Sequence, residues 1–329
     1  MKGSQRTKLT AIIKVGCRFG MSRHLAKKEH GGKSPYIHSV GSFGKVIHRL
    51  WPLLEWMQKK GFGDIEELND TMLSQYLADQ FLYHKEKGNA CHTFQAELSA
   101  LAKFEKCLNA FSVLHRGKPT KYDFSAPLEA YRKLAKTIGK KKRPVSRALT
   151  RPLEVIACLD NPRHILMAEF QLHCGCRAEG VGAPQRPYPG SNHLLPSNFM
   201  LPEGGDILVP VPDPITRQVV HRFWTIEKGG KFAWKHCPLP LAERFFQYCK
   251  ENPEGLTEKY PVYLSVLNKA MKQTGQYAKG RGTHALRFSF AQSRYLNCIY
   301  SGMGDEEAKL FVSKEMSHSR PCITGGYLG

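Results

Sequence analysis

The chain has 329 residues, 41% of them hydrophobic and 23% charged, with 49 Lys and Arg against 28 Asp and Glu, a formal net charge of +21. This length predicts two domains, and the apolar fraction excludes a wholly disordered chain. No run of 18 apolar residues is present and the short apolar stretch near the N-terminus is not a signal peptide, so we expect a cytoplasmic protein.

The N-terminal segment is strongly basic. Residues 1–34 hold nine Lys and Arg against one acid, Glu29. Blocks of like charge repel and stay extended, and they often bind phosphate. We therefore predict a basic arm over residues 1–34 in which Lys8, Lys27 and Lys28 contact nucleic acid. A solvated tail without a partner is the alternative.

Residues 35–116 show helical periodicity throughout. Three amphipathic stripes with short connections predict a small all-α domain. Pro52 lies inside the first stripe and predicts a kink or a late start, while Asp70 and Thr93 are the predicted N-caps of the second and third helices. We interpret these stripes as core rather than as a site.

A basic connector follows over residues 117–148 and contains one short helix that begins at Ser125. Between residues 116 and 151, twelve Lys and Arg oppose two acids. A plain solvated linker needs no such excess, so we expect the connector to lie along a phosphate backbone. The predicted contacts are Lys140, Lys141, Lys142 and Arg143.

Residues 149–329 alternate between helical and strand patterns. Proline and glycine dominate 180–214, which predicts an irregular insert. The predicted strands are 207–211, 219–226 and 232–239, and the predicted helices after them are 242–250, 263–273, 286–300 and 306–316. The chain as a whole is predicted to be mainly α with a small β-sheet.

Ten cysteines are scattered without paired CxxC spacings, and we expect most of them to be reduced, buried thiols. A zinc site would have to draw on His173, Cys174, Cys176, His236 and Cys237. Neither pair has the loop geometry of a zinc knuckle, so we expect no metal and no cofactor.

The signatures of common enzymes are absent: no Walker A loop, no GxGxxG after a strand, no HExxH and no GxSxG. Cationic, imidazole and phenolic residues stand instead at the ends of predicted elements. They are Arg177, Lys228, His284, Arg287, His318 and Tyr327. Two arginines can clamp the oxygens of a phosphodiester, a lysine or imidazole can move a proton, and a tyrosine can attack phosphorus.

Four segments in order resemble the tyrosine recombinase (phage integrase) family. They are Cys174-Gly-Cys-Arg177, Glu227-Lys228-Gly-Gly-Lys231, Thr283-His284-Ala-Leu-Arg287 and Met316-Ser-His318 followed nine residues later by Tyr327. The resemblance implies a helical, SAM-like core-binding domain over 35–116 and an α+β catalytic domain over 149–329 that together clamp duplex DNA. The acidic residue that the family places three positions after its first arginine is replaced here by Gly180.

The resemblance also implies a mechanism. Tyr327 would attack the scissile phosphate to give a 3′-phosphotyrosyl link and a free 5′-hydroxyl. Arg177 and Arg287 would hold the non-bridging oxygens.

The resemblance also assigns the proton transfers and one further contact with the phosphate. Lys228 would protonate the leaving 5′-oxygen, His284 would assist as a base toward the tyrosine, and His318 would hydrogen-bond the phosphate. Because the covalent link stores the bond energy, neither metal nor ATP is required.

The expected activity is therefore site-specific DNA recombination, by the integrase of a phage or mobile element. It would act on double-stranded DNA at a recombination site as a homotetramer, in the cytoplasm and associated with the nucleoid. An accessory DNA-bending protein is a further partner that this activity allows. Two alternatives stay open: a type IB topoisomerase that relaxes DNA with similar groups, and a non-catalytic DNA-binding regulator that would not need Tyr327.

Overall fold

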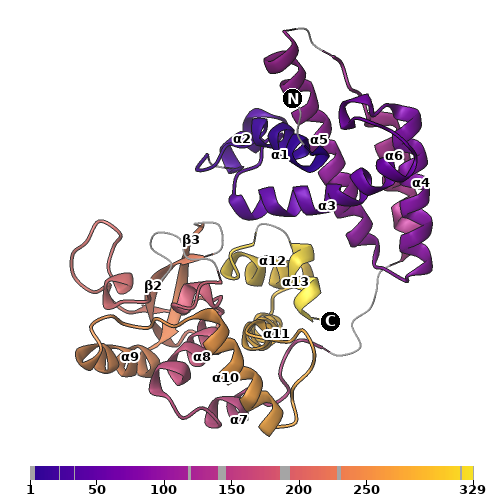
Figure 1. The fold of residues 1–329 in the computed structure, drawn as a ribbon. Coiled ribbons are helices and arrows are strands. Elements are labelled where there is room, and N and C mark those ends of the chain that lie inside the picture. Colours follow the sequence, from indigo (N-terminus) through magenta and orange to yellow (C-terminus); the bar gives the residue numbers. More distant parts are fainter. Residues whose placement is uncertain are drawn as a thin grey trace. The chain divides into compact units, whose positions relative to one another are not determined.

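Helices dominate the computed structural model, which describes residues 4–21, 23–32, 34–117, 120–139, 146–185, 193–227, 231–318 and 321–328 (Figure 1). The chain divides into two units, residues 1–142 and 143–329. No helix within the described ranges is long and apolar enough to cross a membrane.

The described part of the first unit is entirely helical. Its α-helices are α1 (Gln5–Val15), α2 (Arg23–Glu29), α3 (Val40–Lys59), α4 (Asp70–Glu86), α5 (Cys91–Arg116) and α6 (Ser125–Ala135). Helices α1, α3 and α6 all pack against the long helix α5. One continuous apolar core joins these helices.

The N-terminal residues do not form the extended arm that their charge predicts. Ser4 caps α1 by accepting a hydrogen bond from the Thr7 backbone N–H. Leu9, Ile12 and Ile13 are fully buried in the core of the unit. Their i, i+3, i+4 spacing builds an apolar helix face, and its burial outweighs the repulsion between the flanking lysines. The prediction of an extended arm is wrong over α1.

The short helix of the predicted connector also belongs to this unit. Leu128 and Ala135 of α6 are buried in the same core, so 125–135 is a structural element rather than a free linker. Several helix starts differ slightly from prediction. The N-cap of α4 is Asn69 rather than Asp70, and α5 begins at Cys91, two residues before the predicted cap.

The second unit combines helices with one small sheet. Its α-helices are α7 (Pro152–Ala157), α8 (Pro162–Cys174), α9 (Leu239–Glu251), α10 (Tyr260–Gln273), α11 (His284–Tyr300), α12 (Asp305–Glu315) and α13 (Pro321–Leu328). Its strands are β1 (Val211–Pro212), β2 (Val219–Glu227) and β3 (Lys231–Pro238). All three strands are antiparallel in the order β1-β2-β3.

The β2–β3 hairpin and helix α11 organise this unit. The hairpin pairs from Val220 with Pro238 to Glu227 with Lys231. Helix α8 packs against both α11 and β3, and α12 and α13 pack against α11 (Figure 1). The predicted strand 207–211 is reduced to the two residues of β1, because the Pro- and Gly-rich insert before it pairs little with β2.

Candidate active site

The end of α8 places Arg177 beside α11. Gly175 terminates the helix in the left-handed region with φ +64°, and a Cβ at this position would come within 2.5 Å of the Phe290 ring. Only glycine fits both the backbone angle and the close approach. The chain therefore turns sharply after α8, and the Arg177 side chain is left 12% exposed.

Arg287 lies in the first turn of α11 and is fully buried. Its Nη1 donates to the Gly175 carbonyl and to Glu227 Oε1, the latter at 3.2 Å. Its Nη2 donates to the Met316 carbonyl. Its Nε is buried without an acceptor among the described residues. The guanidinium thus holds the ends of α8 and α12 together and keeps one donor unused.

Glu227, the last residue of β2, joins the two arginines. Its carboxylate is fully buried and contacts Arg177 Nη1 and Arg287 Nη1. Burial alone would raise the pKa of Glu227, but the Arg287, Lys235 and Arg177 cations hold it at about 2. Sequence reasoning did not single out this residue as part of the site.

Lys235 of β3 is a second residue that sequence reasoning missed. Its side chain is 1% exposed, and its Nζ lies 3.6 Å from Glu227 Oε1. The same Nζ donates to the Glu315 carbonyl and lies 3.4 Å from Ser317 Oγ. Desolvation lowers the pKa of Lys235, although the Glu227 carboxylate acts in the opposite direction. Lys235 therefore caps the C-terminal end of α12 with a cation, as the helix dipole favours.

His318 and Tyr327 complete a chain of contacts that starts at Arg177. Arg177 Nη2 lies 3.5 Å from His318 Nε2, and His318 Nε2 lies 3.3 Å from the Tyr327 hydroxyl. The Tyr327 ring packs on Phe288, with ring centroids 4.3 Å apart. Tyr327 lies on α13, a helix that the sequence did not predict.

The structure thus brings four of the six predicted catalytic residues into one contact chain. Arg177, Arg287, His318 and Tyr327 are linked directly or through Glu227. His284 begins α11 one turn before Arg287 and is half-buried. Lys228 lies outside the described residues.

Gly180 packs directly under β2, which explains how the site is built without a carboxylate there. A Cβ at position 180 would lie 3.3 Å from Thr225. The buried carboxylate arrives instead from Glu227, two residues further along the same strand.

The predicted DNA-binding residues fall into three groups. Lys8 forms ion pairs with Asp64 and Glu66, and its side chain is 15% exposed. It stabilises the unit internally rather than projecting from an arm. Lys28 is exposed and Lys27 half-buried, both on α2. The remaining four, Lys140, Lys141, Lys142 and Arg143, lie outside the described residues.

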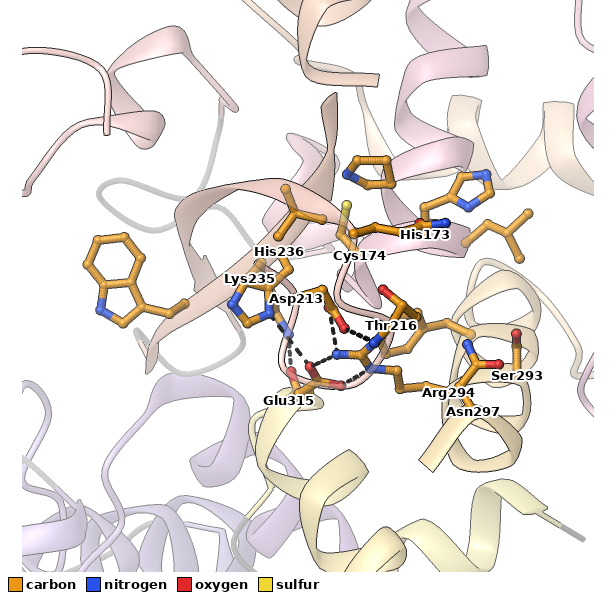
Figure 2. A pocket seen from close by; sticks show the side chains of 16 residues that line it. His173, Cys174, Asp213, Thr216, Lys235, His236, Ser293, Arg294, Asn297 and Glu315 are labelled. Atoms are coloured by element: carbon orange, nitrogen blue, oxygen red, sulfur yellow. Dashed lines mark hydrogen bonds and ion pairs between the residues drawn. The ribbon is translucent and has the colours of Figure 1, made fainter. Parts of the chain in front are cut away.

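A cavity of about 200 Å³ is lined in part by Lys235 and Arg294 (Figure 2). Arg294 of α11 reaches into a cluster of acids there, donating to Asp213 at 2.8 and 2.9 Å and to Glu315 at 2.7 Å. His236 Nδ1 is 3.7 Å from Glu315. Asp213, His236 and Glu315 lie close enough to share a metal ion, but the Arg294 guanidinium already donates hydrogen bonds to all four oxygens of the two carboxylates.

The cysteines near the site are free thiols. Cys174 and Cys176 are buried, and desolvation raises the pKa of both well above its ordinary value. Among the described residues, His236 clusters with Asp213 and Glu315 rather than with the cysteines that a zinc site was considered to draw on.

The chain was compared with known proteins. No family model matches it, and no curated protein matches it. Among solved structures it is similar to a XerH site-specific recombinase bound to a palindromic difH substrate in a post-cleavage complex. The TM-score is 0.62 at 12% identity, over 100% of this chain and 94% of that one.

A second similar structure is the XerH site-specific recombinase bound to difH substrate in a pre-cleavage complex. Its TM-score is 0.60 at 13% identity, with 98% of this chain and 91% of that chain covered. At this level of identity the likeness concerns the fold. The chain has the tyrosine recombinase fold, mainly α with a small three-stranded sheet, as the sequence predicted.

Proposed function

We propose that this protein breaks and rejoins DNA strands at a specific site, with Tyr327 as the nucleophile. The observation that carries the proposal is the contact chain from Arg177 through His318 to the Tyr327 hydroxyl. A phenol placed beside a cationic cluster is suited to attack a phosphodiester, because the developing negative charge is met by fixed donors.

The charge balance of the cluster fits a phosphate. Three cations, Arg177, Arg287 and Lys235, face one carboxylate, that of Glu227. The cluster therefore keeps an excess of positive charge, and Arg287 Nε keeps a donor without an acceptor among the described residues. A phosphorane transition state would be stabilised by this excess of positive charge.

In the proposed reaction the Tyr327 oxygen forms a bond to phosphorus as the bond from phosphorus to the 5′-oxygen breaks. The tyrosine proton passes to a base, for which His284 is the candidate, and Lys228 supplies the proton to the leaving 5′-oxygen. Arg177 and Arg287 are the candidates to hold the non-bridging oxygens, and His318 is the candidate to hydrogen-bond the phosphate. Attack by a 5′-hydroxyl on the phosphotyrosyl link reverses these steps and rejoins the strand.

The partner in this proposal is duplex DNA carrying a recombination site. The net charge of +21 suits such a polyanion. We further propose that the active form is a homotetramer on DNA and that the protein serves a phage or mobile element as its integrase, with an accessory DNA-bending protein as a further partner.

The first test is covalent trapping on a nicked duplex. The protein is incubated with EDTA and nicked DNA taken from the flanks of its own gene, and adducts are resolved on a denaturing gel. We expect an adduct with the wild-type protein and none with Tyr327→Phe, because the variant lacks only the attacking oxygen.

Tyr300→Phe is the matched control, since Tyr300 is 83% exposed at the end of α11. It should form the adduct at the wild-type rate. A Tyr327→Phe protein that still forms an adduct would refute the assignment of the nucleophile. Tight binding without any wild-type adduct would favour a non-catalytic regulator, and DNA relaxation without recombinant products would favour the topoisomerase reading.

A further inference from the structure

Glu227 has the geometry of a residue that orients the two arginines. Its Oε2 accepts a hydrogen bond from Arg177 Nη1. Its Oε1 lies 3.2 Å from Arg287 Nη1 and 3.4 Å from the Arg177 backbone nitrogen. Both carboxylate oxygens are thus committed, one to each guanidinium. No other described acidic residue forms an ion pair with either arginine.

The two edges of the Arg177 guanidinium point to different neighbours. Nη1 is taken by Glu227, whereas Nη2 lies 3.5 Å from His318 Nε2, which in turn lies 3.3 Å from the Tyr327 hydroxyl. A planar guanidinium has a fixed fork of donors, so fixing Nη1 also fixes the direction of Nη2. The contact with Glu227 therefore leaves the other edge of Arg177 directed toward His318.

Glu227 is itself held on the inner side of the cluster. It is fully buried, and Lys235 Nζ lies 3.6 Å from Oε1. A buried carboxylate needs cations and hydrogen bonds around it to remain charged, and here three cations provide them. The carboxylate has no exposed surface with which to touch DNA.

We propose that Glu227 is a positioning residue for strand cleavage, which aligns Arg177 and Arg287 and acts through them rather than on DNA. The inference rests on the proposed function. It goes further in assigning to a carboxylate at the end of β2 the orientation of both arginines. Removal of its charge should slow the chemical step much more than it weakens DNA binding.

The test measures DNA affinity and the single-turnover cleavage rate constant separately, with nicked duplex at a series of protein concentrations. For Glu227→Gln we expect the rate constant to fall by roughly 10- to 100-fold, because misplacing catalytic groups by about 1 Å costs that much. The dissociation constant should change by less than about twofold, since many phosphate contacts outside the site determine affinity.

Glu227→Asp separates charge from packing. Gln has the shape of Glu without its charge, whereas Asp keeps the charge and is one methylene shorter. We expect Asp to cleave more slowly than the wild type but faster than Gln. If Glu227 only fills space, the order of the two variants would be reversed. Glu258→Gln, which removes an acid paired with His164 elsewhere in the unit, is the control and should cleave normally.

Each result decides between the alternatives. A Glu227→Gln protein with the wild-type rate constant, or one that cleaves faster than Glu227→Asp, would overturn the proposal. If thermal melting shows that Glu227→Gln does not fold, a wild-type rate constant in Glu227→Asp would overturn it instead. Failure of the proposed function is distinct, because then the wild-type protein itself would form no adduct.

Discussion

Ser317 is the residue at which the backbone of the site is most constrained. It has φ +58°, in the left-handed region, and directly precedes His318. A side chain in this region costs roughly 1 kcal/mol relative to glycine. The Lys235 ammonium donates to the Glu315 carbonyl and lies near Ser317 Oγ, and these contacts hold the turn in place. The strain is thus retained where the chain must redirect His318 toward Arg177.

Ser317→Gly should relieve this strain. The lost contact between Ser317 Oγ and Lys235 Nζ is long, at 3.4 Å, so it offsets only part of the gain. We expect the free energy of unfolding in urea to rise by about 0.5 kcal/mol and cleavage to persist.

Ser317→Ala is the control for that change, because it removes the hydroxyl and keeps the strained backbone. It should lower the free energy of unfolding slightly. A Ser317→Gly protein no more stable than Ser317→Ala would contradict the argument, because both variants lack the hydroxyl and differ only in how they tolerate the backbone angle.

Individual site residues differ in how far the sequence could reveal them. Arg177, Arg287, His318 and Tyr327 were predicted because each stands in a short ordered motif. Glu227 was not, although a signal was present. Buried Phe223 and Thr225 alternate along β2 with more exposed residues, and the same alternation places position 227 on the inner face.

Lys235 was missed for a different reason. Its role depends on contacts with Glu315 and Ser317, about 80 residues later in the chain. Local periodicity carries no information on which helix end will meet a strand. The contacts of Lys235 with the end of α12 could therefore be recognised only in the tertiary structure.

At the scale of elements, one ion-pair network fixes α12 against the sheet. Arg294 of α11 joins Asp213, which follows β1, to Glu315 at the end of α12 (Figure 2). The Asp213 carboxylate also accepts the backbone N–H groups of Ile215 and Thr216. Burial would raise the pKa of Asp213, but these hydrogen bonds and the Arg294 charge lower it to about 2.

This network makes stability depend on pH. An acid whose folded pKa lies below its unfolded value stabilises the fold above the unfolded pKa, and this stabilisation is lost as pH falls through the folded pKa. Asp213 shifts from 3.8 to about 2, so its contribution, on the order of 2 kcal/mol, should be complete above pH 4 and disappear toward pH 2.

Asp213→Asn tests this expectation. The difference in the free energy of unfolding between wild type and variant should be largest above pH 4 and shrink as pH falls toward 2. Glu227 titrates in the same window in both proteins and cancels from the difference. Asp160→Asn, at an exposed position, is the control. A wild-type to Asp213→Asn difference that stays constant with pH would contradict the argument.

Element prediction succeeded where apolar periodicity was strong and failed where charge was taken as decisive. Helices α9, α10, α11 and α12 and the hairpin β2–β3 were predicted within a few residues. Helix α1 was not, because nine cations in residues 1–34 concealed the apolar face formed by Leu9, Ile12 and Ile13. Helix α13 was overlooked because its two glycines favour a turn.

Across the whole molecule, some of the basic residues are paired with acids and others are not, and only the unpaired ones are available to bind DNA. Lys8 is paired with Asp64 and Glu66, and Arg294 with Asp213 and Glu315, so these contribute little net field. Only cations that are free to meet phosphate release counterions from DNA. The salt dependence of binding therefore counts a subset of the 49 basic residues.

The basic residues of α1 and α2 should therefore differ in how much they contribute to the salt dependence of DNA binding. Exposed Lys28 and half-buried Lys27 form no ion pair within the described residues, whereas Lys8 forms two. Substituting both Lys27 and Lys28 with Gln should weaken duplex DNA binding and reduce the slope of log K against log salt by about 1.8, since each released contact contributes about 0.9. The effect should appear equally on unrelated DNA sequences, because phosphate contacts carry no sequence information.

Lys8→Gln is the matched control for that pair and should behave in the opposite way. It removes the ion pairs of Lys8 with Asp64 and Glu66, so the protein should unfold at a lower urea concentration while the salt slope of binding stays unchanged. Fluorescence anisotropy over 50–300 mM salt and urea titration measure the two effects independently. A reduced slope for Lys8→Gln, with wild-type slopes for the α2 variant, would return the phosphate-binding role to α1 and remove it from α2.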